Sequence, residues 1–203
     1  MERSDIINQL IKTYGYKSYL EIGYGNGYTF NKIQIENKVG VDGGNGTPSG
    51  DTVVVRMRSE DYFIMAQERQ LSNFDIIFID GSHLHEDVEK DIASSLQFLS
   101  SNGTVVMHDC SPPNIFFQER TQSPYVGGWT GDVWKAFVKF RTTRSDLDMC
   151  VVDTDYGCGI VRFGNQKLLE INIDKDLEYT SLDENRKEWL NLITPEEFLE
   201  RHG

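Results

Sequence analysis

The sequence lacks any apolar run long enough to cross a membrane. Its 203 residues contain no stretch that approaches the ~18 consecutive apolar residues expected of a spanning helix. The first residues, Met-Glu-Arg-Ser-Asp-Ile, also lack the charged-then-apolar layout of a secretory signal. We therefore expect a cytoplasmic protein with no membrane partner.

Cysteine and basic residues are also scarce. The three cysteines, Cys110, Cys150 and Cys158, form no CxxC pair and are too few for a disulfide framework, which favours a reduced cytosolic setting. The 20 basic residues are outnumbered by 32 acidic ones, so the formal net charge is −12. Nucleic-acid binding depends on Lys and Arg meeting phosphates, and this balance argues against a general nucleic-acid-binding protein.

Internal repeats, low-complexity tracts and proline-rich linkers are absent, and the length suits one domain. Short β-rich runs alternate instead with longer helical patterns. We predict strands at 18–22, 38–42, 52–56, 74–79 and 103–107, and helices at 4–14, from the glycine-rich segment after residue 22 to about Ile35, from about Ser59, and at 86–99. This alternation is typical of a parallel sheet covered by helices on both faces.

The pattern changes after residue 110. Residues 111–131 are rich in Pro and Gly and are predicted to be a loop, followed by a helix at 132–144. Residues 148–152 and 159–163 predict an antiparallel hairpin, and Thr194-Pro195-Glu196-Glu197 predicts a capped final helix. We expect an α/β domain over 1–165 with a Rossmann-like, mostly parallel seven-stranded sheet. Residues 166–203 are expected to be an acidic helical extension packed on that domain.

The segment Glu21-Ile22-Gly23-Tyr24-Gly25-Asn26-Gly27 lies where a strand is expected to lead into a helix. Glycines there let a ligand approach the backbone, although a tight turn without a ligand is the structural alternative. Asp42, at the end of the next strand, is placed to accept hydrogen bonds from ribose hydroxyls. The spacing differs from the GxGxxG of dinucleotide-binding enzymes, since the sixth position is Tyr28.

This segment resembles the first motif of class I S-adenosylmethionine-dependent methyltransferases, an acid-x-Gly-x-Gly-x-Gly pattern that begins here at Glu21. The resemblance extends over about residues 15–165, because the order of strands and helices also agrees. It implies S-adenosylmethionine as cofactor, with this loop around its amino-acid end, Asp42 at its ribose, and the residues after the third strand near adenine. The candidate cofactor-binding residues are Glu21, Gly23, Tyr24, Gly25, Asn26, Gly27, Asp42, Gly43, Ser59, Glu60, Asp61 and Asp80.

Two further acids follow the fourth and fifth predicted strands. Asp80 opens Asp80-Gly81-Ser82-His83, and Asp109 lies in His108-Asp109-Cys110. The carboxyl ends of parallel strands meet at one edge of the sheet, so both acids should share a crevice with the glycine loop. They can hold a divalent metal, or one of the histidines can serve as a general base. The catalytic candidates are Asp80, His83, His108 and Asp109, and the metal candidates are Asp80 and Asp109.

Residues 78–83, with Asp91 and residues 107–109, resemble a methyltransferase subgroup that includes small-molecule and sugar O-methyltransferases, some of them metal-dependent. In the metal-dependent relatives a second Asp or Asn follows the acid of strand five, whereas Cys110 stands here. Because Mg²⁺ prefers oxygen ligands, this difference weakens the case for Mg²⁺ or another divalent metal. The resemblance implies methyl transfer to an oxygen of a small molecule, and it leaves nitrogen acceptors open.

Two features after residue 110 concern the methyl acceptor. Trp129, in the glycine-rich loop, is placed to stack on an acceptor such as a sugar. Lys135 shares a helix face with Lys139 in a segment of net positive charge, which favours an anionic metabolite as acceptor. The alternative is that these cations complement a helix C-terminus. His85, at a helix start, is expected to be solvated, and a homodimer is compatible with the sequence.

Two other functions are compatible with these motifs. A protein that kept the fold but lost catalysis would bind S-adenosylmethionine without transferring its methyl group. A nicotinamide-dependent oxidoreductase is disfavoured by the glycine spacing. Methyl transfer to a small molecule is the main expectation.

Overall fold

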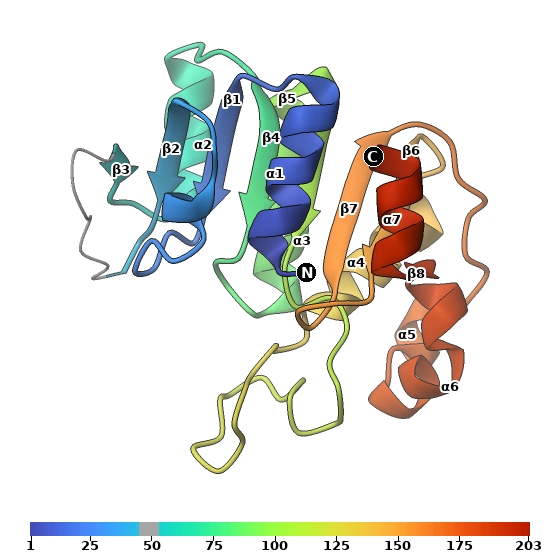
Figure 1. The fold of residues 1–203 in the computed structure, drawn as a ribbon. Helices are drawn as coiled ribbons and strands as arrows, with labels where there is room; N and C mark the ends of the chain where they lie inside the picture. Colours follow the sequence, from blue (N-terminus) through green and yellow to red (C-terminus); the bar gives the residue numbers. More distant parts are fainter. Residues whose placement is uncertain (45–52) are drawn as a thin grey trace.

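Four parallel strands form the centre of the sheet in the computed structural model, which describes residues 1–44 and 53–203 (Figure 1). In this described part, eight strands follow the order β3-β2-β1-β4-β5-β7-β6-β8. Their bounds are β1 Ser18–Ile22, β2 Asn37–Val41, β3 Val54–Val55, β4 Phe74–Ile79, β5 Leu99–Met107, β6 Leu147–Val152, β7 Cys158–Phe163 and β8 Leu192–Ile193. Only the pairs β5–β7 and β6–β7 are antiparallel.

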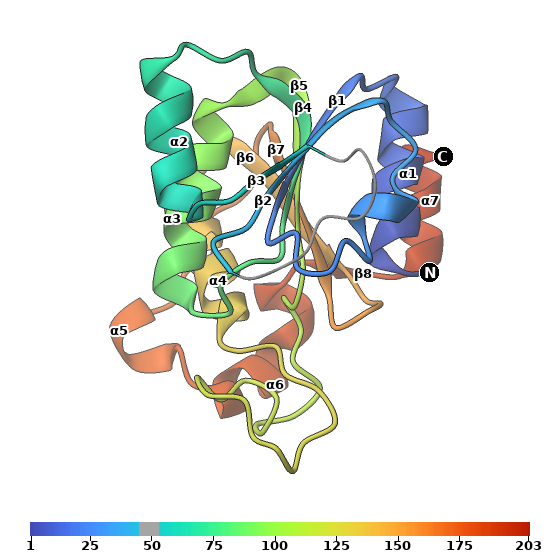
Figure 2. The same ribbon diagram turned by 90° about the vertical axis from the view of Figure 1, so that its left-hand side faces the viewer.

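Helices cover both faces of this sheet (Figure 2). Their bounds are α1 Arg3–Tyr14, α2 Ser59–Glu68, α3 His85–Gln97, α4 Val133–Thr143, α5 Ile173–Asp176, α6 Tyr179–Trp189 and α7 Pro195–His202. The helices α2, α3 and α4 lie on one face, and α1 and α7 lie on the other. None of the described helices is long and apolar enough to span a membrane.

Strand alternation explains the two layers of the core. Successive side chains of a strand point to opposite faces, so Ile77 and Ile79 of β4 pack with α2, α3 and α4, whereas Ile76 and Phe78 pack with α1 and α7. All four side chains are buried. The apolar run Ile76–Ile79 in β4 is therefore typical of a strand covered on both faces.

The predicted fold class is confirmed, with one additional strand. Leu192 and Ile193 form β8, which pairs in parallel with β6 beyond the predicted seven strands. Of the predicted strand 52–56, Thr52 lies outside the described residues, and Val54–Val55 form β3. The predicted loop at 111–131 and the predicted Thr194 cap are both observed.

The helix predicted to run to about Ile35 is wrong. Only a single 3₁₀ turn, Phe30–Lys32, follows the glycine loop, and Ile33 has an extended backbone. The ammonium of Lys38 donates hydrogen bonds to the carbonyls of Phe30 and Ile33. In a longer helix both carbonyls would accept from backbone N–H groups. Here the carbonyl of Phe30 accepts from the N–H of Ile33 as well as from Lys38, and Lys38 donates to the carbonyl of Ile33.

The ends of β1, β4 and β5 are aligned. Ile22 pairs with Ile79, and Ile79 pairs with Met107, so the next residue of each strand emerges at the same edge. These next residues are Gly23, Asp80 and His108. This register is what brings the glycine loop and the acid-histidine segments together.

Candidate active site

Two adjoining cavities lie at this edge of the sheet. The first, of about 360 Å³, and the second, of about 340 Å³, share Gly23, Gly25 and Asp80 as lining residues. The first extends along Asp42 and the start of α2, and the second extends towards His83, His108 and Asp109. Because they share the glycine loop, they form one elongated site with two ends.

The glycine loop approaches the end of β4 very closely. A Cβ atom on Gly23 would lie 2.1 Å from the carbonyl oxygen of Asp80, and Gly23 has φ +91°. Gly25 has φ +54°, and no atom lies within 4 Å of the position where its Cβ would be. Glycine is therefore required at 23 for packing, whereas at 25 it allows a left-handed backbone beside an open space.

Asp42 faces the same loop from the end of β2. Its two carboxylate oxygens accept hydrogen bonds from the backbone N–H groups of Gly25 and Gly44, each at 2.6 Å. These bonds fix the carboxylate at the wall of the first cavity. An oriented carboxylate there can accept hydrogen bonds from neighbouring hydroxyls of a ligand.

Most residues predicted to bind the cofactor line one of the two cavities. The exceptions are Gly27 and Asp61, which line neither. Sequence reasoning did not propose Met57, Arg58, Asp87 or Lys90, which line the first cavity, and it noted Asp91 only as part of a family pattern. Asp87, Lys90 and Asp91 lie three or four positions apart on α3, a spacing that places them on one helix face.

Glu21 is almost completely buried below the second cavity. Its side chain is 1 % exposed, and the hydroxyl of Tyr19 donates a hydrogen bond to Oε2. Burial raises the pKa of Glu21 to about 8, because the hydrogen bond from Tyr19 offsets only part of the desolvation. Glu21 is therefore mainly protonated at neutral pH in this structure.

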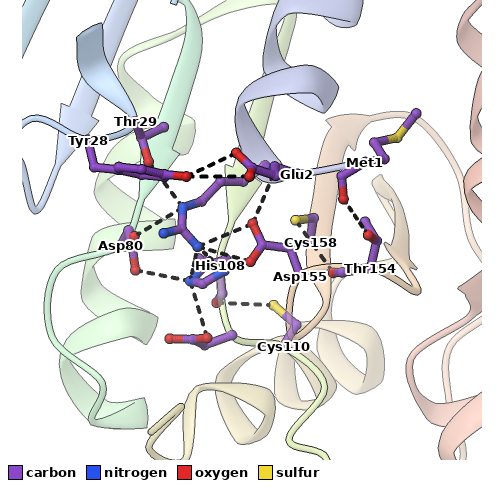
Figure 3. Close-up of polar contacts among 12 residues, drawn as sticks. Met1, Glu2, Tyr28, Thr29, Asp80, His108, Cys110, Thr154, Asp155 and Cys158 are labelled. Carbon is purple, nitrogen blue, oxygen red and sulfur yellow. Dashed lines mark hydrogen bonds and ion pairs between the residues drawn. The ribbon is translucent and has the colours of Figure 1, made fainter. Parts of the chain in front are cut away.

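His108 is buried among three carboxylates. Its Nδ1 lies 3.1 Å from Asp109 Oδ1 and 3.3 Å from Asp80 Oδ1, and its Nε2 lies 3.4 Å from Asp155 Oδ1. Burial lowers the pKa of His108, but the hydrogen bonds with the three carboxylates outweigh this effect and raise it well above the ordinary value. Figure 3 shows Asp80, His108 and Asp155 converging from three different segments.

Arg3 opposes the carboxylates at His108. Its Nη1 lies 2.6 Å from Nε2 of His108 and can only donate, which requires an unprotonated Nε2. Three carboxylates and one guanidinium surround the ring of His108, so the net effect is the raised pKa of His108. In either form both ring nitrogens are engaged, which leaves His108 poorly placed to take a proton from an acceptor.

His83 is more accessible than His108. Its Nδ1 lies 3.2 Å from Asp109 Oδ2, and its Nε2 lies 3.9 Å from Asp80 Oδ1. Although Nδ1 is buried and close to Asp109, the geometry does not make a hydrogen bond. A hydrogen bond depends on direction as well as length, so the short distance alone does not pair Nδ1 with Asp109.

Asp80, His83 and Asp109 can also meet at one ion. One ligand atom from each lies within 4.8 Å of the others. The buried Nδ1 of His83 without a hydrogen bond is an available ligand, so these residues fit a divalent ion. Two carboxylates and one imidazole suit a transition metal better than Mg²⁺, which prefers oxygen ligands.

Trp129 lines the second cavity beside His83. The two rings stack with a centroid distance of 4.5 Å and an interplanar angle of 4°. Lys135 lines neither cavity, and its ammonium lies 5.7 Å from the ring centroid of Trp134. The structure therefore brings one of the two predicted acceptor-binding residues to the catalytic candidates.

Two other cations of this segment are paired with acids. Lys139 binds Glu89, and Arg144 binds Asp146 at 2.7 Å. Ion pairs of this kind reduce the positive field that these side chains present to an approaching ligand.

The expectation that His85 is solvated is wrong. Asp132 is buried, and it accepts a hydrogen bond from the backbone N–H of His85 at 2.8 Å while its other oxygen lies 2.9 Å from His85 Nδ1. Arg120 contacts the same carboxylate at 2.8 Å. A buried carboxylate requires such partners, and they attach the loop after β5 to the start of α3.

Several side chains of the second cavity gave no sequence signal. Arg3, Tyr28, Thr29 and Tyr156 line it, and Asp155 contacts Arg3. Asp155 and Tyr156 lie in the turn between β6 and β7, which sequence reasoning interpreted only as a connection. No local spacing reveals these residues, because tertiary packing brings them to the site.

Comparisons with known proteins agree with this arrangement. The family model of a methyltransferase domain matches residues 45–110. No curated protein matches this sequence.

Solved structures resemble most of the chain. A methyltransferase from Podospora anserina bound to S-adenosylhomocysteine has a TM-score of 0.59 and 14% identity, with 80% of this chain and 78% of that chain covered. The O-methyltransferase TomG from Streptomyces achromogenes, bound to S-adenosylmethionine, has a TM-score of 0.58 and 14% identity, with 80% of each chain covered. An O-methyltransferase from Bacillus cereus, bound to S-adenosylhomocysteine, has a TM-score of 0.57 and 12% identity, with 78% of this chain and 79% of that chain covered.

At these identities the solved structures establish the fold. The family match covers about a third of the chain, and its range includes the acids Asp80 and Asp109 that follow β4 and β5. The fold implied by the resemblance is thus confirmed: the chain has the class I methyltransferase fold, and its residues 45–110 match a methyltransferase domain.

Proposed function

We propose that this methyltransferase moves a methyl group from S-adenosylmethionine to an oxygen atom of a small molecule. The observation that carries the proposal is the elongated site, in which two cavities share Gly23, Gly25 and Asp80. When bound, S-adenosylmethionine supplies a methyl group on a positively charged sulfur. The solved relatives that contain this cofactor or its product support the assignment.

The residues present fit that cofactor. Open space beside Gly25 allows a ligand to approach the backbone, and the oriented carboxylate of Asp42 suits a ribose. We assign the adenosine to the first cavity, where Ser59 and Glu60 lie, and the amino-acid end to the second. Cavities of this size are within the usual range for small ligands.

On the acceptor side we assign the base to His83. Its Nε2 lies 3.9 Å from Asp80 and can take the proton of an acceptor hydroxyl. The carboxylate of Asp109 lies 3.2 Å from Nδ1, and Trp129 stacks on the ring, covers one of its faces and excludes water from it. His108 holds Asp80 and Asp109 in place rather than accepting the proton.

A metal-assisted version uses the same side chains differently. A divalent ion would be held by Asp80, His83 and Asp109, and it would polarise the acceptor oxygen. His83 would then be a ligand and not the base. Dialysis against a chelator, followed by addition of Mn²⁺ or Mg²⁺, separates the two versions. Turnover that does not change supports His83 as the base. Turnover that is lost on dialysis and restored by the added ion supports the metal-assisted version.

The acceptor is proposed to carry a hydroxyl close to a flat apolar group or sugar ring that stacks on Trp129. An anionic acceptor receives no support from Lys135, which lies outside both cavities. Homodimerisation and a cytoplasmic location stay predictions from the sequence. We also propose domain limits of 1–165 with an extension at 166–203, supported by the pairing of β8 with β6.

The test combines binding and turnover. Calorimetry should show that the purified protein binds S-adenosylhomocysteine, and radiolabelled S-adenosylmethionine should label a small molecule in a metabolite extract. His83→Gln should abolish labelling while leaving binding intact, and Lys135→Gln is the matched control with unchanged labelling. Binding without labelling of any acceptor would indicate a non-catalytic binding protein, and absence of binding would refute the proposal.

A further inference from the structure

The proposed reaction leaves one charged side chain of the second cavity without a role. This side chain is Arg3, from the first turn of α1. We propose that Arg3 binds the carboxylate of the cofactor's amino-acid end, so that α1 completes the cofactor site. The inference rests on the proposed use of S-adenosylmethionine, and it assigns a residue far in sequence from the glycine motif.

Arg3 is held in place before any ligand binds. Its Nε donates to Thr29 Oγ1 at 3.1 Å, and its Nη1 lies 3.2 Å from each carboxylate oxygen of Asp155. The backbone N–H of Arg3 also donates to Asp155 Oδ2 at 3.0 Å. A guanidinium fixed on two sides loses little further freedom when it binds a ligand.

One edge of the guanidinium remains available. Within residues 1–44 and 53–203, Nη2 of Arg3 makes no hydrogen bond, in contrast to Nε and Nη1. The side chain is 20% exposed and lines the cavity. Its open edge therefore offers N–H donors that suit a carboxylate.

The position of Arg3 indicates which carboxylate it binds. Thr29, its partner, follows the glycine loop by two residues, and the same cavity is lined by Gly25 and Asn26. The amino-acid end of the cofactor carries both an ammonium and a carboxylate. Glu21 and Asp80 line this cavity and suit the ammonium, while Arg3 is the arginine that lines it and suits the carboxylate.

A carboxylate on the acceptor is the alternative ligand. Acceptors are proposed to bind at His83 and Asp109, where the carboxylate of Asp109 repels an anion. The side of Arg3 towards Thr29 faces the glycine loop instead. We therefore assign Arg3 to the cofactor and leave the acceptor as an outcome of the test.

The start of α1 is attached to both sides of the site. Glu2 forms an ion pair with Lys32 at 2.7 Å, just beyond the glycine loop, and the hydroxyl of Thr154 donates to the carbonyl of Met1 (Figure 3). Asp155, which holds Arg3, has φ +48°. A left-handed backbone is unfavourable for aspartate relative to glycine, and surrounding contacts must maintain it.

The experiment compares three ligands by calorimetry. S-adenosylhomocysteine has the carboxylate, its decarboxylated analogue lacks that group alone, and 5′-methylthioadenosine lacks the whole amino-acid end. Arg3→Gln should weaken binding of S-adenosylhomocysteine about 10- to 100-fold, the range for a charge-assisted hydrogen bond. Binding of the other two ligands should change less than about threefold, since they make no contact with Arg3.

Two further proteins serve as controls. Lys12→Gln removes an exposed positive charge from the same helix and should bind all three ligands as the unmodified protein does. Arg3→Lys keeps the charge but not the planar fork, and its affinity for S-adenosylhomocysteine should be intermediate. If Arg3→Gln does not fold, the unmodified protein still tests the inference, because it should prefer S-adenosylhomocysteine to the decarboxylated analogue at least tenfold.

Several results would overturn the inference. Unchanged affinity of Arg3→Gln for S-adenosylhomocysteine would move Arg3 to the acceptor or to a purely structural role. Equal weakening of all three ligands would show that Arg3 only holds α1 in place. Failure of the unmodified protein to bind S-adenosylhomocysteine at all would instead refute the proposed function.

Discussion

Replacement of Glu21 by glutamine should stabilise the protein in a pH-dependent way. The pKa of Glu21 is raised from an ordinary 4.5 to about 8 by burial. Below pH 4.5 both folded and unfolded chains hold this proton; between 4.5 and 8 only the folded chain does; above 8 neither does. The contribution of Glu21 to stability is therefore fully present below pH 4.5 and is lost as pH rises towards 8.

The size of this effect follows from the same shift. At about 1.4 kcal/mol per pH unit, the unmodified protein loses about 3 kcal/mol between pH 4.5 and 7, and about 5 kcal/mol in total above pH 8. Glutamine carries no proton to lose, and its amide oxygen can still accept the hydrogen bond from Tyr19. The difference in unfolding free energy between Glu21→Gln and the unmodified protein should therefore grow with pH.

Urea unfolding followed by tryptophan fluorescence at pH 5, 7 and 9 measures this difference directly. A difference in unfolding free energy that is the same at every pH would reflect packing, and it would not bear on the expected pH dependence. The expected growth from pH 5 to 7 is about 2.5 kcal/mol, so a difference that grows by less than about 1.2 kcal/mol over this range would contradict the reasoning.

Three other predictions concern ligand binding and the loop. Affinity for S-adenosylhomocysteine should rise up to about 50-fold from pH 6 to 8 as Glu21 ionises to meet the ligand's ammonium, and Glu21→Gln should flatten this profile in calorimetry. Gly23→Ala should destabilise the protein by at least about 2 kcal/mol in thermal unfolding, because its Cβ would collide with a carbonyl oxygen; Gly25→Ala should cost less stability but more affinity. Asp132→Asn should weaken the contact with His85 and speed limited proteolysis of the loop after β5, and an unchanged cleavage rate would show that other contacts hold that loop.

Local sequence patterns predicted the centre of the fold. Residues 74–79 are apolar except for Asp75 and are followed by Asp80-Gly81, so both bounds of β4 were predictable. The glycines of the loop were also identifiable from the sequence, because a left-handed backbone conformation is a local requirement that favours glycine. Once the strand order was known, the rule that parallel strands end at one edge brought Asp80 and Asp109 together.

Long-range contacts were not predictable from these patterns. The two residues of β8 are too few to show a period, and their strand conformation depends on pairing with β6. Arg3 and Asp155 look like an ordinary helix start and a turn. His85 appeared solvated because the buried carboxylate of Asp132 reaches it from 47 positions away.

The contact between Arg3 and Asp155 has a consequence for the order of folding. The two residues are 152 positions apart, so the pair can form only after the β6–β7 hairpin has joined the rest of the sheet. A chain that has folded only as far as β5 would already have the glycine loop, but Arg3 would lack the carboxylate that fixes it. A ligand that depends on Arg3 would then stabilise only the fully folded chain, and its affinity would report that the last hairpin is in place.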